Sequence, residues 1–268
     1  MIRSAVLLAS LLAAGAQAAE EVPFVVTPDS VTLAMLQIAK VGPEDYVIDL
    51  GSGDGRIVIL AARRFGARGL GVEIRDDLID RSRASASAAG VSDRVAFRNQ
   101  DLFKTDLSPA SVVTLYLLPE VNLQLRPRLL QLRPGTRVVS HDFDMGDWEA
   151  DKVQSVDAPD KPIGLDKKSK VYLWIVPARV EGLWCGVRKA KGKSLAIAQR
   201  HQHVRIDLPE DGKVRALDGR LTGNVIRTRS GALNLAVDGQ RLRTTYAAGT
   251  NATLKGATFA RARGQSCG

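Results

Sequence analysis

Residues 49–55 combine flexible backbone with negative charge. They read Asp49-Leu50-Gly51-Ser52-Gly53-Asp54-Gly55, between the apolar run 46–50 and the helix-like segment 56–65. Glycines let a backbone turn sharply and approach a ligand closely, and the helix that follows offers unpaired N–H groups to the same place. The two carboxylates would repel a pyrophosphate and attract a cation. The loop therefore predicts a site for a positively charged small molecule.

The same loop departs from the dinucleotide-binding pattern G-x-G-x-x-G. In that pattern the third glycine allows close packing of helix and strand under a pyrophosphate. Here Arg56 stands at the third position, and Gly55 comes one residue earlier. A dinucleotide is therefore the poorer fit.

Short apolar strands alternate with helix-length segments from about residue 31 to residue 177. The patterns predict helices at 31–40, 56–65, 76–89 and 122–131, and strands at 46–50, 69–73, 94–98, 112–117, 137–142 and 170–176. Such alternation is typical of βαβ units on a parallel sheet with helices on both faces. We therefore expect an α/β, Rossmann-like, doubly wound sheet.

An acidic residue follows each of the first three predicted strands. Asp49 ends the first, Glu73 ends the second in Gly71-Val72-Glu73-Ile74, and Asp101 follows the third in Asn99-Gln100-Asp101-Leu102. Ligands of open α/β sheets bind at the carboxyl ends of the strands. We expect the three acids to face one crevice.

This arrangement resembles the class I S-adenosylmethionine-dependent methyltransferases, whose first motif is an acidic residue followed by G-x-G-x-G. The resemblance implies S-adenosyl-L-methionine as cofactor. It implies that Glu73 binds the ribose hydroxyls and that Asp101, with Leu102 beside it, holds the adenine amino group. The implied loop contacts are Asp49, Gly51, Ser52, Gly53, Asp54 and Gly55.

A narrower resemblance covers roughly residues 22–150. Val26-Thr27-Pro28, the string DLGSGDGRIV and Gly146-Asp147-Trp148 are similar to the small protein-lysine methyltransferases that include the mitochondrial ATP-synthase c-subunit enzyme. In that family the segment ahead of the first helix helps cover the cofactor, which implicates Thr27, and the acceptor is a protein lysine. The Asn/Asp-Pro-Pro-aromatic motif of many amine methylators is absent here, so the acceptor atom stays open.

Residues beside the transferred methyl would position the acceptor and take its proton. Displacement at a sulfonium depends on alignment and desolvation, and an amine acceptor must also lose a proton. Glu120, His141 and Tyr116 are the catalytic candidates, and the Tyr116 ring could enclose an alkylammonium. His141 ends the fifth predicted strand and is expected at the cleft rim, with a structural hydrogen-bonding role as the alternative.

The chain changes character after residue 180. Helical patterns disappear, and strand-like segments are separated by Gly, Asp-Gly and Pro-Glu-Asp-Gly. We expect a methyltransferase domain at 19–178 and an antiparallel barrel or sandwich at 179–268. Residues 180–268 hold 16 of the 38 Lys and Arg but 6 of the 29 Asp and Glu. This charge predicts docking to an anionic envelope surface or an acidic protein, whereas nucleic acid is disfavoured because no binding motif accompanies it.

Two residue pairs in the C-terminal region could carry chemistry. His201 and His203 have strand spacing, which would place both rings on one face. A metal site needs further ligands that the sequence does not offer, so a solvated strand face is expected and no metal. Cys185 and Cys267 permit one disulfide, closing a loop of about 80 residues, or remain as two thiols.

The first 18 residues have the three regions of a secretory signal peptide. Arg3 precedes the apolar stretch Ala5–Ala16, and Ala16-Gln17-Ala18 forms a small-x-small cleavage site. The stretch is too short to span a bilayer, and nothing after it predicts a span. We therefore expect export. Because S-adenosylmethionine is made in the cytoplasm, an exported non-catalytic binding module on this fold is the alternative.

Overall fold

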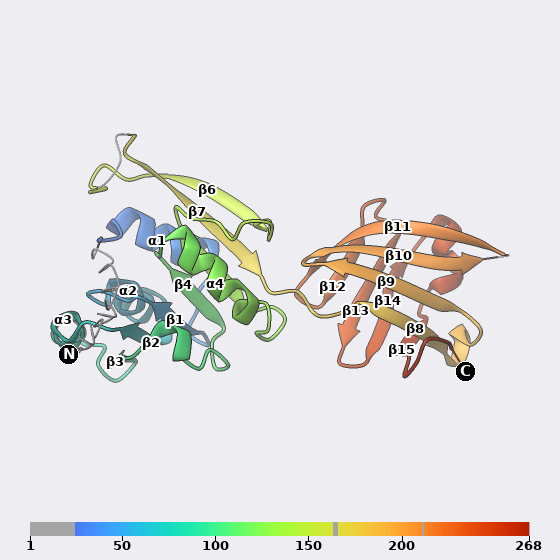
Figure 1. The fold of residues 1–268 in the computed structure, drawn as a ribbon, viewed down its shortest axis with the longest axis horizontal. Coiled ribbons are helices and arrows are strands. Elements are labelled where there is room, and N and C mark those ends of the chain that lie inside the picture. The colour runs from blue at the N-terminus through green and yellow to red at the C-terminus, as the bar shows by residue number, and fades with distance from the viewer. Residues whose placement is uncertain (1–24, 163–165, 211, 268) are drawn as a thin grey trace, which may run out of the picture.

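The computed structural model describes residues 25–162, 166–210 and 212–267. The predicted signal peptide at 1–18 lies outside these residues. The chain folds into an α/β domain and a β-barrel, joined by the connection between Ile175 and Gly182 (Figure 1). No helix in the described part is long and apolar enough to cross a membrane.

Seven strands form the sheet of the first domain, in the order β3-β2-β1-β4-β5-β7-β6. The strands β1 to β5 are parallel, and β7 runs antiparallel between β5 and β6. Their bounds are β1 Tyr46–Leu50, β2 Arg68–Glu73, β3 Val95–Asn99, β4 Val112–Leu115, β5 Arg137–His141, β6 Lys152–Asp157 and β7 Lys168–Ile175. The predicted doubly wound sheet is confirmed. β6 has no counterpart in the prediction, because its mostly exposed residues show no buried periodicity.

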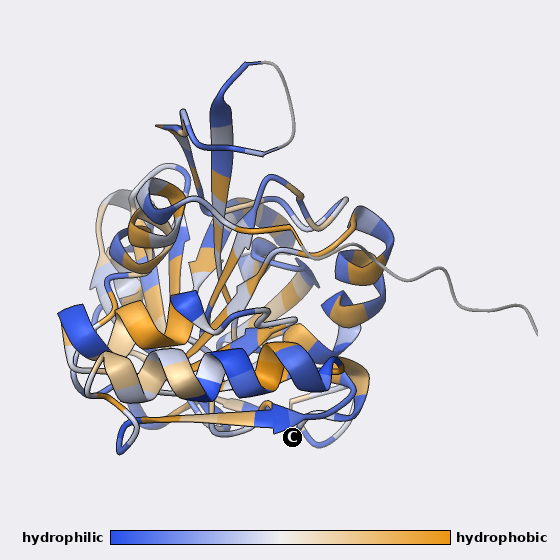
Figure 2. Ribbon diagram, turned by 90° about the vertical axis from the view of Figure 1, so that its left-hand side faces the viewer, coloured by the Kyte–Doolittle hydropathy of each residue, from blue (hydrophilic) through white to orange (hydrophobic). Residues whose placement is uncertain are grey.

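Helices cover both faces of this sheet. α1 (Asp29–Ile38), α2 (Arg56–Phe65) and α3 (Asp76–Ala88) share one apolar core, and α4 (Pro119–Leu129) packs into the other. Figure 2 shows hydrophobic residues concentrated on the central strands, with hydrophilic residues toward the outside. α4 begins three residues before the predicted start, because proline is well suited to a first helical position.

Eight strands close the second domain into an up-and-down barrel. Each strand pairs antiparallel with the next, and β15 returns to pair with β8. The strands are β8 Gly182–Val187, β9 Ser194–Arg200, β10 His203–Glu210, β11 Lys213–Thr222, β12 Val225–Thr228, β13 Leu233–Asp238, β14 Arg241–Ala247 and β15 Thr258–Arg261. Inward apolar side chains, among them Leu195, Ile206 and Phe259, give the barrel its own core. Of the two predicted architectures, the barrel is the one formed.

The end of the chain is tied back to the barrel. Cys185 in β8 and Cys267 form a disulfide, with their Cα atoms 5.5 Å apart. The Arg261 guanidinium lies 4.4 Å above the centre of the Trp184 ring and donates to the Arg179 carbonyl at 2.6 Å. These contacts fix both the linker and the C-terminal segment against β8.

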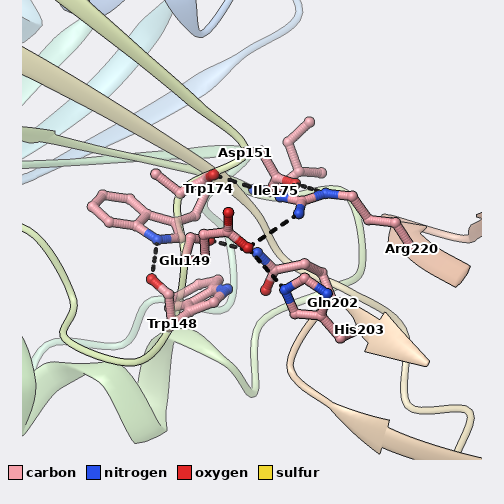
Figure 3. A network of polar contacts seen from close by, with 9 residues as sticks. Trp148, Glu149, Asp151, Trp174, Ile175, Gln202, His203 and Arg220 are labelled. Atoms are coloured by element: carbon pink, nitrogen blue, oxygen red, sulfur yellow. Dashed lines mark hydrogen bonds and ion pairs between the residues drawn. The ribbon is translucent and has the colours of Figure 1, made fainter. Parts of the chain in front are cut away.

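The two domains meet through acidic residues that follow β5 and basic residues of the barrel (Figure 3). Glu149 Oε2 lies 2.9 Å from His203 Nε2, and the Asp151 carboxylate accepts from Arg220 at 2.8 Å. Buried Gln202 donates to the Glu149 carbonyl at 2.5 Å. A main-chain bond from Ala178 to the Gly223 carbonyl joins the linker to the β11–β12 turn.

The expectation that His201 and His203 share a strand face is wrong. β9 ends at Arg200 and β10 begins at His203, so His201 lies in the tight turn between them with φ of 50°. The His201 ring faces Trp148 of the first domain, with ring centres 6.4 Å apart. Both histidines therefore serve the contact between domains. In the described part of the chain, no group of three or more His, Cys, Asp or Glu could hold a metal ion.

Candidate functional site

A cavity of about 580 Å³ opens at the carboxyl ends of β1, β2 and β4. This volume is typical of small-molecule sites. The glycine loop, the ends of β2 and β4, the segment after β3 and residues 25–27 form its wall. The predicted site residues in the wall are Thr27, Asp49, Gly51, Ser52, Gly53, Asp54, Glu73, Asp101, Leu102 and Tyr116.

Gly55 lies behind the cavity wall and shapes it indirectly. Its φ is 79°, and a Cβ there would come within 2.6 Å of the Phe97 ring. Only glycine accommodates both this backbone and this close approach. Gly55 therefore lets α2 start directly beneath the loop.

Asp49 lines the cavity and is almost fully buried, with 2% of its surface exposed. Burial raises the pKa of Asp49 to about 7. The Thr114 hydroxyl donates a hydrogen bond to Asp49 at 2.6 Å and opposes this rise. The negative charges of Asp54 and Glu73 add to the rise. No basic side chain in the described chain pairs with Asp49. A cationic ligand beside this buried, unpaired carboxylate would stabilise its charged form.

Main-chain amides orient the two acids that follow. Glu73 Oε2 accepts from Gly53 N at 3.1 Å, which ties the end of β2 to the glycine loop, and Oε1 accepts from Ile74 N at 2.8 Å. Asp101 Oδ1 accepts from Phe103 N at 2.8 Å and caps the short helix η1 (Leu102–Lys104). The acids after β1, β2 and β3 therefore face one cavity, as acceptors held in fixed positions.

Asp54 differs from these acids because Arg56 neutralises it. Arg56 Nε and Nη2 donate to the two carboxylate oxygens at 3.0 and 2.7 Å. Burial alone would raise the pKa of Asp54, but the hydrogen bonds and charge of Arg56 outweigh it and lower the pKa. The two loop acids therefore differ in charge environment: Asp54 lines the cavity as half of an ion pair with Arg56, whereas Asp49 has no basic partner among the described residues.

Arg56 also fastens residues 25–28 across the cavity. Its Nη1 donates to the Thr27 carbonyl at 2.9 Å and lies 3.5 Å from Asp29 Oδ1. One guanidinium therefore joins the glycine loop, residues 25–27 of the cavity wall and the start of α1. In the sequence Arg56 is visible only as a departure from the dinucleotide pattern, because nothing local reveals a partner 29 residues away.

Tyr116 is the catalytic candidate that lines the cavity. Its ring stacks on His141, with centres 3.9 Å apart, and more loosely on Phe143 at 6.3 Å. Burial, and to a smaller extent the charge of Asp142, raises the pKa of the Tyr116 hydroxyl. The phenol therefore stays protonated and offers a ring face and a donor, not a base.

His141 is completely buried behind Tyr116, so the expected position at the cleft rim is wrong. Antiparallel pairing of β5 with β7 covers this strand end, and His141 Nε2 lies 2.8 Å from Ser169 Oγ in β7. Burial lowers the pKa of His141 to about 4; Asp142 opposes this shift and Lys161 adds to it. The neutral ring contacts two residues of the cavity wall: it stacks on Tyr116, and its Nδ1 lies 3.4 Å from Thr27 Oγ1.

Glu120 lies outside the cavity wall. It is exposed in the first turn of α4, where a negative charge favours the helix N-terminus. The start of α4 at Pro119 carries the Glu120 side chain away from the position expected at a strand end. Of the three catalytic candidates, Tyr116 alone touches the cavity.

The prediction did not include the two exposed apolar side chains that lie beside Glu73 and Asp101 in the wall. Ile74 is 67% exposed and Phe103 is 39% exposed, and they border the cavity beside Glu73 and Asp101. Exposed apolar groups next to fixed acceptors suit a flat ring with polar edges. The sequence could have indicated them, because each lies within two residues of a predicted acid.

Comparisons with known proteins agree with this geometry. The ANTKMT methyltransferase domain model matches residues 49–152. A protein-lysine N-methyltransferase of Saccharolobus islandicus (strain REY15A) is 46% identical over 157 residues, covering 58% of this chain and 94% of that protein. The adenine nucleotide translocase lysine N-methyltransferase of Mus musculus is 39% identical over 110 residues, covering 40% of this chain and 48% of that protein.

A solved structure shows the same similarity. The RNA methyltransferase of Salinibacter ruber in complex with S-adenosyl-L-homocysteine is 52% identical, with a TM-score of 0.52, over 58% of this chain and 96% of that one. None of these three proteins matches more than 58% of this chain.

Proposed function

This chain belongs to the S-adenosyl-L-methionine-dependent protein-lysine N-methyltransferase family, and on that premise we propose that it methylates a lysine side chain of a partner protein. The resemblance found in the sequence, the cofactor and the enzyme class are confirmed by these relatives. The proposal therefore concerns the acceptor that the resemblance already implied, a protein lysine.

The described residues fit the cofactor. Asp49 is a buried acid without a cationic partner, Glu73 and Asp101 present fixed acceptors, and Ile74 and Phe103 form an apolar border. When bound, S-adenosyl-L-methionine would supply a sulfonium methyl group for transfer by in-line displacement, with S-adenosyl-L-homocysteine as the leaving group. Asp49 would lie toward the positive end of the cofactor, and Glu73 toward the ribose hydroxyls.

The charge of the cavity wall favours a lysine over a nucleic acid as the methyl acceptor. The acids in the wall are Asp49, Asp54, Glu73 and Asp101, whereas its bases are Arg56 and Arg75. Both arginines are already in ion pairs, Arg56 with Asp54 and Arg75 with Asp77. The surplus negative charge attracts an alkylammonium and repels a phosphate chain. The Tyr116 ring, in the same wall, can hold such a cation by cation–π contact.

RNA is the competing acceptor, because the Salinibacter ruber relative is described as an RNA methyltransferase. The mature protein can be incubated with labelled cofactor and either total protein or total RNA of its source cells. Hydrolysis and mass spectrometry then separate methyl-lysine from methylated nucleosides. Methyl-lysine in the protein fraction is the expected result, and label confined to nucleosides would overturn the proposal.

Thr27 connects the acceptor amine to buried His141. A lysine ammonium must lose a proton before attack. The Thr27 hydroxyl lies 3.4 Å from the neutral imidazole, which orients it; the hydroxyl can accept a hydrogen bond from the ammonium and help pass its proton to solvent, because an imidazole with a pKa of about 4 does not keep that proton. Thr27→Val should lower kcat by about tenfold near pH 7.5. The deficit should shrink toward pH 9.5, because a free lysine, with a pKa of about 10.4, increasingly supplies its own neutral amine.

Two controls separate proton transfer by Thr27 from its packing. Thr27→Ser keeps the hydroxyl and should retain most of kcat, and cofactor affinity should stay similar in both variants. Equal pH–rate profiles for Thr27→Val and the wild type would remove Thr27 and His141 from the mechanism.

Arg56 should control how fast the cofactor product leaves. Asp54→Asn/Arg56→Met removes the fastening of residues 25–28 without leaving an unpaired acid. We expect S-adenosyl-L-homocysteine to dissociate about tenfold faster in stopped-flow fluorescence, because charged hydrogen bonds contribute roughly 1.5–3 kcal/mol each. Arg63→Met, on the exposed side of α2, is the matched control. An unchanged dissociation rate would show that residues 25–28 do not hold the ligand.

We also propose that the protein is exported and that its barrel docks to an anionic envelope surface or an acidic protein. The disulfide supports export, since such bonds persist in oxidising compartments. The basic composition of the barrel supports docking. Fractionation of native cells tests the first point, and recovery with cytoplasmic markers would contradict it.

A further inference from the structure

The barrel has two ends with different surroundings. Its strands alternate in direction, so the turns after β9, β11 and β13 lie at one end and those after β8, β10, β12 and β14 at the other. Gln202 and Gly223, in the first group, contact the α/β domain or its linker. We call the segments 188–193, 212–215 and 246–255, together with residue 210, at the opposite end, the distal rim. Figure 1 shows the β10–β11 hairpin reaching away from the first domain.

Positive charge gathers on the distal rim. Six of its basic side chains are exposed, and none makes an ion pair with a described residue: Arg188, Lys189, Lys191, Lys193, Lys213 and Lys255. Glu210 is the acid that the structure describes there, and Arg215 holds it at 3.3 Å. The cations come from three separate turns, so they form a broad positive surface without a pocket for one anion.

Exposed apolar side chains accompany the charge. Val214 is 65% exposed and Tyr246 is 51% exposed, and they are the large apolar residues exposed on the described barrel. Both belong to the distal rim. Tyrosine has an apolar ring and a polar tip, which suits the boundary between water and lipid headgroups.

We propose that the distal rim binds the surface of a bilayer containing anionic phospholipids. This narrows the docking proposed above and is independent of methyl transfer. Five of the six free cations are lysines, which are depleted at protein–protein interfaces, where arginine is enriched. Lysine acts as a hydrated point charge and suits a diffuse anionic surface, whereas arginine suits bidentate recognition. A lipid surface therefore fits the composition better than an acidic protein does.

Binding of the mature protein to sedimented vesicles tests the proposal. Vesicles of equal parts phosphatidylcholine and phosphatidylglycerol should bind the wild type, phosphatidylcholine alone should not, and high salt should release it. Each cation near the surface is worth about fivefold in affinity, so Lys189→Gln/Lys191→Gln/Lys193→Gln should bind about 100-fold more weakly. Tyr246→Ser should also weaken binding.

A charge-matched variant provides the control. Lys40→Gln/Arg63→Gln/Arg64→Gln removes three exposed cations from the α/β domain and should bind vesicles like the wild type. The rim variant should keep its thermal unfolding midpoint and its methyl transfer to a dissolved acceptor, which separates this proposal from the enzymatic one. Absence of binding to anionic vesicles, or equal loss in both triple variants, would overturn it and leave an acidic protein as the candidate partner.

Discussion

Asp49→Asn should remove tight binding of S-adenosyl-L-methionine and at the same time stabilise the free protein. The asparagine keeps an acceptor for the Thr114 hydroxyl but loses the buried charge that faces the cationic ligand. We expect cofactor affinity to fall about 100-fold or more, since unpaired buried charges cost several kcal/mol. Isothermal titration calorimetry at about pH 8 measures this loss.

The stability change in the same variant follows from the pKa of Asp49. Its pKa is about 7 in the folded protein and 3.8 ordinarily, so the native state binds the extra proton between these values. Stability of the wild type therefore declines as pH rises through this window. Asp49→Asn removes the decline and should be more stable by on the order of 2–4 kcal/mol at pH 8, with little difference near pH 4. Urea unfolding at both pH values tests it.

Cofactor binding by the wild type should also depend on pH. Below about pH 7 Asp49 is largely protonated in the free protein, so a cationic ligand must displace that proton. Affinity should decline on acidification, and protons should be released at pH 6, as calorimetry in buffers of different ionisation enthalpy can show. Asp80→Asn, an exposed acid on α3, is the matched control. Tight binding by Asp49→Asn would contradict the assigned role of Asp49.

Reducing the disulfide should destabilise the barrel while sparing the α/β domain. Cys185 and Cys267 are 82 positions apart, and the loop that they close contains nearly the whole barrel. The chain-entropy model gives about 4 kcal/mol for a cross-link of this span. The α/β domain has separate apolar cores, so its transition and its cofactor affinity should be unchanged.

Urea unfolding with and without a reductant measures this effect. Replacing Trp184 by Phe assigns the barrel transition, because Trp184 belongs to the barrel core and Trp148 and Trp174 to the α/β core. The double variant Cys185→Ala/Cys267→Ala should match the reduced wild type and not respond to reductant. A reduced wild type as stable as the oxidised one would mean that the β8–β15 closure alone holds the barrel.

Much of the site could be predicted because its signals are local. Asp49, Glu73 and Asp101 each follow an apolar strand, and in a parallel sheet all such positions lie at one edge. The glycine loop is equally local, since glycine is the residue type that readily permits the positive φ values found at Gly51, Gly53 and Gly55. The change from helical to strand patterns after residue 180 likewise marked the barrel.

The remaining features depend on partners far apart in the chain. His141 is buried because β7 pairs beside β5, and it meets Thr27 across 114 positions. Arg56 neutralises Asp54 and reaches residues 25–28, and the cysteines pair only because β15 closes onto β8. The sequence by itself thus determined which acidic residues and glycines lie at the strand ends, because periodicity and residue type are visible within a few positions of the chain. Only the tertiary structure decided which side chains are shielded, paired or exposed, since burial and electrostatic pairing depend on contacts across the whole fold.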